Sequence, residues 1–334
     1  MVNKKVKYDS GDEGNSMTQK KIVYQNPIVL ERADPWVYKH SDGYYYFTGS
    51  VPGYQEIEVR RARTLNELET GECATVWNAH TEGEMSRLIW APEIHFVRGK
   101  WYIYFAAAGS AETADGTFQH RMYALECSDE NPLTGKWIEK GQIKTHLESF
   151  SLDATVFEHQ EKLYYVWAQK DPEIEGNSNL YISEMATPWQ LQGEITMLSI
   201  PEYDWEIIGF WVNEGPAVIK RNGKVFIAYS GSATDENYCM GLLWADENSE
   251  LLDAESWSKS SEPVFVSSEA NSLFGPGHNS FTVSEDGEND VLIYHARPKK
   301  VTEVEPLDVP DRHANAQVFT WDENGFPVFG EPGQ

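Results

Sequence analysis

Short runs of alternating apolar and polar residues recur along the chain, and five of them share one pattern. Each begins with a polar or acidic residue, continues as a short apolar strand, reverses at a turn and returns as a strand rich in aromatic or aliphatic residues. The five units begin at Asp34, Glu93, Asp153, Glu214 and Asn279. Three of the turns contain Asp-Gly or Asn-Gly, which is the strongest local signal for a β-hairpin. The pattern therefore predicts five equivalent hairpins.

The spacing of these hairpins predicts the architecture. Successive units start 59, 60, 61 and 65 residues apart, and a period of about 60 residues fits one four-stranded propeller blade with generous loops. Further strand-like stretches, such as 56–60 and 122–126, follow the hairpins and supply outer strands. We predict an all-β, five-bladed β-propeller with four antiparallel strands per blade. The regular spacing disfavours the alternatives, a β-sandwich or two small β-domains.

The propeller is expected to be one catalytic domain over residues 22–334. Residues 1–21 are polar and charged, and we expect them to form a disordered N-terminal extension.

Acidic residues open three of the five units. Because the first strand of each blade lines the central channel, Asp34, Asp153 and Glu214 should meet at one end of one cavity, with Glu93 near the same register. Crowded carboxylates raise the pKa of at least one member, so such a cluster either binds a cation or performs acid–base chemistry. The dense Asp, Asn and Gly spacing of a calcium loop is missing, which favours acid–base chemistry.

Glycosidic bond hydrolysis is a reaction that needs such a set. One carboxyl group must be ionised to take a proton from water, and another must be protonated to donate a proton to the leaving oxygen. A third carboxylate raises the pKa of the acid through like-charge repulsion and orients it. Three carboxylates in one cavity would supply these roles.

Six short motifs follow one another along the chain. They are Arg32-Ala-Asp-Pro35, Trp90-Ala-Pro-Glu93, Ser151-Leu-Asp-Ala154, Asn213-Glu-Gly-Pro216, Gly277-His-Asn-Ser280 and Tyr294-His-Ala-Arg297. In this order they resemble glycoside hydrolase family 43, the five-bladed propeller arabinofuranosidases, arabinanases and xylosidases. The resemblance extends from residue 27 to about residue 330.

The resemblance implies a role for each carboxylate. Asp34 would be the general base, Asp153 the residue that modulates the pKa and orientation of the acid, and Glu214 the general acid. The family is inverting, so the base and the acid should stand about 6.5–9.5 Å apart to admit a water molecule. No cofactor would be required for the chemistry.

The resemblance also implies roles for three neighbours, each with a structural alternative. Trp90 would form a wall of the substrate pocket, or pack between blades. Arg297 would reach the sugar or the modulating aspartate, or pair with a structural carboxylate. His278 would lie near the axis, where family members hold a structural calcium or sodium ion through water and a histidine, or it would be a core histidine.

The motifs around 32–36, 209–214 and 274–278 are most similar to exo-acting α-L-arabinofuranosidases. We therefore expect an inverting glycosidase that releases terminal α-L-arabinofuranose from α-1,5-linked arabino-oligosaccharides. A β-xylosidase or an endo-arabinanase on the same scaffold is the first alternative. A non-catalytic carbohydrate-binding propeller is the second.

Charge restricts the partners. The formal net charge of −26 argues against nucleic acid, whose recognition needs clustered Lys and Arg, and against anionic membranes. Neutral arabinose- or xylose-containing oligosaccharides are the expected partners, and the oligomeric state is left open.

Cysteine usage and hydropathy suggest a compartment. Cys73, Cys127 and Cys239 are widely separated and indicate neither a disulfide framework nor a zinc site. The longest apolar runs, such as 102–108, are too short to span a bilayer, and the N-terminus has no apolar signal core. These features predict a cytoplasmic location.

Overall fold

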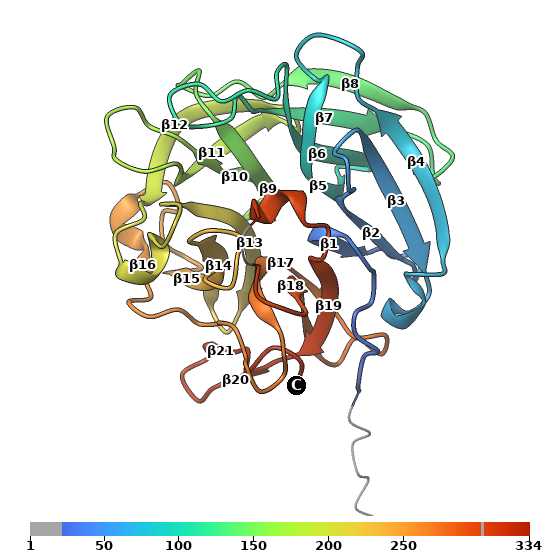
Figure 1. Cartoon of the computed structure of the whole chain (residues 1–334), viewed down its shortest axis with the longest axis vertical. Coiled ribbons are helices and arrows are strands. Elements are labelled where there is room, and N and C mark those ends of the chain that lie inside the picture. Colours follow the sequence, from blue (N-terminus) through green and yellow to red (C-terminus); the bar gives the residue numbers. More distant parts are fainter. Residues whose placement is uncertain (1–21, 302–303) are drawn as a thin grey trace, which may run out of the picture.

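Five antiparallel sheets are arranged around a central axis in the computed structural model of the protein, which describes residues 22–301 and 304–334 (Figure 1). The inner strands contact one another in a closed ring. The predicted five-bladed propeller is therefore confirmed. The extension expected at residues 1–21 lies outside the described residues.

The blades follow one another along the chain, and in each the innermost strand comes first. Blade one contains β1 (Ala33–Lys39), β2 (Tyr45–Ser50), β3 (Glu56–Ala62) and β4 (Glu72–Asn78). Blade two contains β5 (Arg87–Val97), β6 (Lys100–Ala108), β7 (Arg121–Cys127) and β8 (Trp137–Gln142). Blade three contains β9 (Ser151–His159), β10 (Lys162–Gln169), β11 (Asn179–Thr187) and β12 (Gln190–Ser199). Blade four contains β13 (Asn213–Arg221), β14 (Lys224–Gly231), β15 (Cys239–Asp246) and β16 (Ser258–Lys259).

Blade five differs from the expected four strands. Its sheet has three, β17 (Phe274–Val283), β18 (Asp290–Arg297) and β19 (His313–Val318), and β20 (Thr320–Trp321) pairs separately with β21 (Pro327–Val328). The outer edge of β19 is occupied by the N-terminal segment, because Val29 forms an antiparallel bridge with Ala314. Asn26 also exchanges two hydrogen bonds with the backbone of Ala316, both of 2.8 Å. The two ends of the described chain thus close the ring together.

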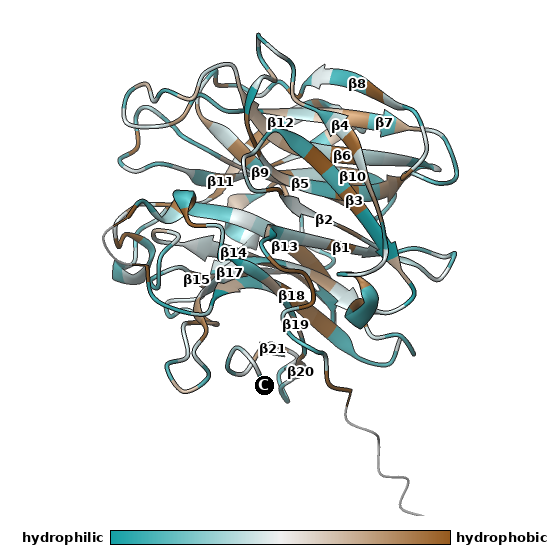
Figure 2. Ribbon diagram, turned by 45° about the vertical axis from the view of Figure 1, so that its right-hand side comes forward, coloured by the Kyte–Doolittle hydropathy of each residue, from teal (hydrophilic) through white to brown (hydrophobic). Residues whose placement is uncertain are grey.

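The hydrophobic core is divided between neighbouring blades. One cluster joins blades one and two through residues such as Tyr46 and Trp101, and another joins blades one and five through Phe47 and Ile293. Figure 2 shows hydrophobic segments running along strands such as β3 and β18. Because each blade buries its faces against its neighbours, the ring itself is the stable unit.

A bulge recurs near the start of every inner strand. Residues with positive φ lie in these bulges, namely Asp34, Ala91, Asp153, Gly215 and His278; β5 and β17 each have a second bulge, with Leu88 and Gly275. A non-glycine residue in this conformation costs about 1–2 kcal/mol, and bulges bend a strand and redirect a side chain. The repeated bulge therefore brings side chains from different blades to the same end of the channel.

Helices are short in the described part of the chain. Four 3₁₀ turns occur there, η1 (Leu65–Glu67), η2 (Asp204–Glu206), η3 (Ala254–Ser256) and η4 (Pro306–Asp308). None of them has the length and apolarity that a membrane-crossing helix needs.

Candidate active site

A cavity of about 310 Å³ lies where the inner strands begin. Asp34 from β1, Asp153 from β9 and Glu214 from β13 all line it. The structure thus brings together the three carboxylates that the repeat pattern placed at one end of the ring. His278 from β17 and Arg312, just before β19, also line the cavity, and Glu305, just before η4, adds a further carboxylate.

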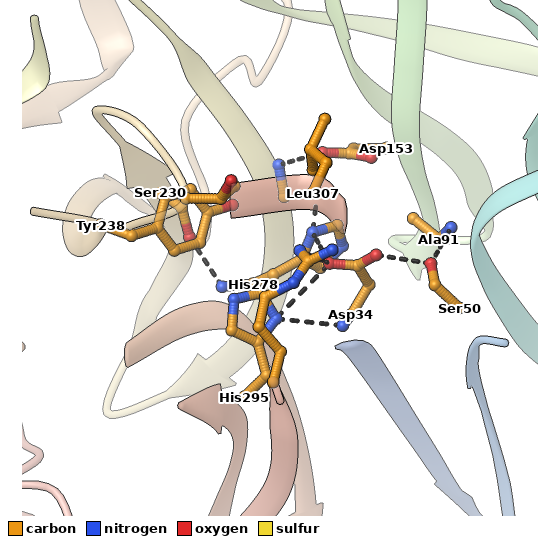
Figure 3. Close-up of polar contacts among 12 residues, drawn as sticks. Asp34, Ser50, Ala91, Asp153, Ser230, Tyr238, His278, His295 and Leu307 are labelled. Atoms are coloured by element: carbon orange, nitrogen blue, oxygen red, sulfur yellow. Dashed lines mark hydrogen bonds and ion pairs between the residues drawn. The ribbon is translucent and has the colours of Figure 1, made fainter. Parts of the chain in front are cut away.

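Asp34 is held by contacts from its own blade and from blade five (Figure 3). Its Oδ2 accepts a hydrogen bond of 2.5 Å from the Ser50 hydroxyl, and its backbone N–H donates to His295 Nδ1 at 3.1 Å. Its Oδ1 lies 3.2 Å from His278 Nδ1 and 3.6 Å from Arg312 Nη1. These contacts leave the carboxylate little freedom to rotate.

The same contacts keep Asp34 ionised. Burial alone would raise the pKa of this carboxyl group, but His278 and Arg312 outweigh burial and hold the pKa well below its ordinary value. Burial lowers the pKa of His278, so its imidazole is neutral near pH 7. The permanent positive charge beside Asp34 is therefore that of Arg312.

Asp153 and Glu214 are linked through one backbone amide. The N–H of Gly215 donates to Asp153 Oδ2 at 3.1 Å, so the residue after Glu214 is tied directly to the neighbouring carboxylate. Gly215 has φ of 56°, and a Cβ there would lie 3.1 Å from His278 Cγ. Glycine is needed at this point because the backbone turns left-handed and passes close to the imidazole ring.

Glu214 and Asp153 hold protons more tightly than Asp34 does. Burial is the main cause for Glu214, whose pKa rises to about 7, with a further increase from Asp34 and opposing effects of Tyr238 and Arg312. Burial and the charges of Glu214 and Asp34 raise the pKa of Asp153 well above its ordinary value. The cavity thus combines an ionised carboxylate with a carboxylic acid near neutral pH, the pair that general acid–base hydrolysis uses.

Glu93 is separated from this group. Its carboxyl oxygen lies 2.8 Å from His95 Nε2, both side chains are buried, and Glu93 does not line the cavity. His95 lines a hollow farther along the inner strands, together with Trp36 and Thr155. The bulge residue of blade two is Ala91, so Glu93 lies two residues beyond the equivalent position and faces deeper into the channel.

Trp90 lines the cavity, as the wall residue was expected to do. Its ring stacks on His120 with centroids 4.0 Å apart and meets the edge of Phe118 at 5.1 Å. The alternative of packing between blades also holds in part, since Trp90 contacts the cluster formed by blades two, three and four. One face of the indole ring is thus supported by protein.

Arg297 does not line the cavity, in contrast to the expected contact with sugar or with Asp153. Its guanidinium group is buried and donates to the carbonyl oxygens of Thr234, Pro306 and Val309, and it forms an ion pair with Asp311. The side chain ends against residues 304–311, a segment we call the strap. The structural alternative, a pair with a carboxylate, is the arrangement that the structure has.

The strap covers one side of the cavity and was missed by sequence reasoning. Glu305 and Leu307 of the strap line the cavity, and the Tyr54 hydroxyl donates to the Leu307 carbonyl oxygen at 3.0 Å. Arg312 follows the strap directly. Neither the strap nor Arg312 belongs to the repeated hairpins, so no periodic signal marked them.

Tyr238 was also missed. Its hydroxyl group donates to Glu214 Oε1 at 2.9 Å, and its ring is buried. It lies in the connection between β14 and β15, outside the inner strands that the repeat identified. No motif in the sequence pointed to it.

The surroundings of His278 were tested for the expected ion. Among residues 22–301 and 304–334, no group of three His, Cys, Asp or Glu side chains is placed to hold a metal. The neutral His278 ring nevertheless faces two carboxylates, with Nδ1 3.2 Å from Asp34 Oδ1 and 3.7 Å from Asp153 Oδ2. The next residue, Asn279, is buried with both polar side-chain atoms unpartnered. This donor set fits a hydrated hard cation, not a thiolate-bound metal.

A five-bladed propeller with an ionised carboxylate and a protonated carboxyl group in one cavity is the framework of a glycoside hydrolase that works by acid–base catalysis. Residues 24–327 match the family described as Glycosyl hydrolases family 43, and the chain belongs to that family. Members of this family need no cofactor for catalysis.

Two curated relatives come from Streptomyces. The chain is 51% identical over 311 residues to an "Extracellular exo-alpha-(1->5)-L-arabinofuranosidase" of Streptomyces avermitilis. The alignment covers 93% of this chain and 64% of that protein. The chain is also 51% identical over 277 residues to a protein of the same name from Streptomyces chartreusis, with 83% of each covered. This chain therefore spans slightly less than two thirds of the Streptomyces avermitilis protein.

Solved structures share the fold. The α-L-arabinofuranosidase of Lactobacillus brevis superposes with a TM-score of 0.91 at 58% identity, covering 92% of this chain and 97% of that one. An endo-arabinanase of Bacillus licheniformis has a TM-score of 0.61 at 13% identity, covering 92% of this chain and 99% of that one. At that identity the second comparison shows the fold alone.

The predicted cytoplasmic location is wrong. Both Streptomyces relatives are named extracellular enzymes, and this finding contradicts a cytoplasmic assignment. The prediction failed because unpaired cysteines do not identify a compartment: a chain with a core of this size does not need disulfides to be stable outside the cell.

Proposed function

We propose that the protein is an inverting, exo-acting α-L-arabinofuranosidase that releases terminal α-L-arabinofuranose from α-1,5-linked arabino-oligosaccharides. The observation that carries this proposal is the unequal proton affinity of Asp34 and Glu214 in one cavity. The sugar and linkage are supported by the names of the two Streptomyces relatives and of the Lactobacillus brevis enzyme.

The reaction is a single displacement. Asp34 takes a proton from a water molecule as the water attacks the anomeric carbon, and Glu214 gives a proton to the departing glycosidic oxygen. Asp153 is the proposed modulator of the acid: its own pKa responds to the charge of Glu214, and its carboxyl group accepts the Gly215 N–H, which aligns the strand that carries Glu214. Trp90 forms one wall for the terminal sugar ring.

The stereochemistry of the first product tests the proposal. Proton NMR during hydrolysis of α-1,5-arabinotriose should show β-L-arabinofuranose before mutarotation. Initial release of the α-anomer would exclude single displacement. No hydrolysis of the triose or of aryl glycosides, with sugar binding retained, would favour the non-catalytic alternative.

Two assays separate the enzymes that share this scaffold. Aryl α-L-arabinofuranoside should be cleaved and aryl β-D-xyloside should not; the reverse would identify a β-xylosidase. Dyed, debranched arabinan should release arabinose alone, whereas a mixture of oligomers would identify an endo-arabinanase. Neutral oligosaccharides are the proposed partners because a net charge of −26 repels anionic polymers.

We propose that His278 holds a hydrated calcium or sodium ion, with Asn279 as a further donor. When bound, the ion would add positive charge beside the carboxylates. Its test is thermal: chelation by EDTA should lower the Tm of the wild-type protein if the ion is calcium, and His278→Ala should lose that response. An identical EDTA effect in both proteins would contradict a site at His278.

A further inference from the structure

We propose that Tyr238 is a positioning residue that selects which oxygen of Glu214 carries the transferable proton. This inference depends on the proposed acid role of Glu214. Nothing in the repeated motifs assigns Tyr238, and its side chain does not line the cavity.

The hydroxyl group of Tyr238 contacts only one oxygen of the acid. It donates to Glu214 Oε1 at 2.9 Å. In a protonated carboxyl group the carbonyl oxygen is the better acceptor, so a hydrogen bond to Oε1 places the proton on Oε2. Tyr238 thereby gives the acid a single proton position.

The ring of Tyr238 is held firmly enough to do this. It is 1% exposed and lies parallel to the His295 ring, with centroids 5.4 Å apart and an interplanar angle of 13°. On β17 of the neighbouring blade, a Cβ at Gly277 would lie 2.6 Å from Tyr238 Cδ1. The absence of a side chain at Gly277 therefore makes room for the ring and confines it.

The same residue reaches the base through His295. His295 accepts the backbone N–H of Asp34 at 3.1 Å, so one buried aromatic ring contacts the acid directly and supports a ligand of the base. This arrangement fixes the position of the Glu214 carboxyl group relative to that of Asp34.

Tyr238 also limits how far the proton affinity of Glu214 rises. Burial raises the pKa of Glu214, and the hydrogen bond from Tyr238 opposes that increase because it favours the ionised form; the net pKa is about 7. The titratable and charged groups around the pair come from five other elements: Asp34 on β1, Asp153 on β9, His278 on β17, His295 on β18 and Arg312 before β19.

The test is Tyr238→Phe, which keeps the ring and removes the hydroxyl group. The basic limb of the kcat/KM profile should move upward by about 0.5 to 1 pH unit, the size expected for one hydrogen bond. Turnover of arabinotriose should fall about tenfold more than turnover of an aryl arabinofuranoside with a good leaving group, which needs little proton donation.

Tyr294→Phe is the matched control. Tyr294 is equally buried, but its hydroxyl group donates to Gln317 Oε1 at 3.0 Å, away from the cavity. This variant should leave the basic limb and the substrate ratio unchanged. If Tyr238→Phe behaves in the same way, or loses activity equally on both substrates with an unmoved limb, the inference is wrong.

A titration that does not use activity separates this inference from the proposed function. With ¹³C-labelled glutamate, the Glu214 carboxyl resonance, assigned by its loss in Glu214→Gln, should titrate at higher pH in Tyr238→Phe than in the wild type. An unchanged titration would overturn the inference even in an active enzyme. An inactive wild-type protein with a shifted titration would instead count against the hydrolase proposal.

Discussion

Asp153 and Gly215 are joined by a hydrogen bond of 3.1 Å from the glycine amide to the carboxylate. This bond connects blades three and four one residue away from the proposed acid. The proposed modulator of the acid therefore also fixes the backbone that carries Glu214. Asp153→Asn should therefore lower kcat through the pKa and leave the position of β13 largely unchanged.

The assignment of Asp34 as the base predicts a general loss of activity. Asp34→Ala should lower kcat about 10²- to 10⁴-fold on arabinotriose and on aryl arabinofuranosides alike, because Asp34 is the one of the three inner-strand carboxyl groups whose pKa is held low enough to activate water. Steady-state kinetics on both substrates check this. A variant that retained rapid aryl hydrolysis would show that Asp34 is not the base.

The assignment of Glu214 as the general acid predicts a loss of activity that depends on the leaving group. Glu214→Ala should impair arabinotriose hydrolysis by about 10²-fold or more, and a dinitrophenyl arabinofuranoside far less, since that leaving group departs without a proton. The ratio of the two kcat values is the measurement. Equal losses on both substrates would argue against an acid at position 214.

The pH dependence of activity follows from the lowered pKa of Asp34 and the raised pKa of Glu214. Glu214 is active when protonated and has a pKa of about 7, so kcat/KM should fall as the pH rises through about 7. Asp34 is active when ionised and its pKa is held low, so activity should persist well into the acidic range. In Glu214→Ala the basic limb should disappear for the dinitrophenyl substrate; its persistence would assign that limb to another group.

Arg312 should control the acidic limb. Its charge favours ionised Asp34, so Arg312→Met should raise the pKa of Asp34 and move the acidic limb to higher pH. Arg312→Lys, which keeps the charge, should move it less. If the pH–activity profiles of the wild type and both variants coincide, Arg312 does not set the pKa of Asp34.

Arg297 should contribute to the stability of the fold by holding the strap, and should not contribute to substrate binding. Arg297→Met removes a buried guanidinium group with three carbonyl partners and one carboxylate, so we expect the free energy of unfolding to fall by about 3–5 kcal/mol, measured by urea denaturation. A raised KM with unchanged stability would instead support direct contact between Arg297 and the substrate.

Much of this site follows from the repeat. Residues that open inner strands are periodic, and a ring of blades must bring Asp34, Asp153 and Glu214 together. Arg312 and Tyr238 could not be found in this way, because they lie in connections whose paths depend on how the completed ring packs. Arg297 ends a recognisable strand, but the direction of its side chain is set by the strap, which has no periodic signal.

The bridge between Val29 and Ala314 has a consequence for synthesis. Asp34 lies five residues after Val29, so the proposed base is anchored beside a strand that leaves the ribosome after the first four blades. Arg312, the charge that keeps Asp34 ionised, emerges with that strand. A nascent chain that has completed four blades thus lacks a working base, and hydrolytic competence arises only when the final blade is formed.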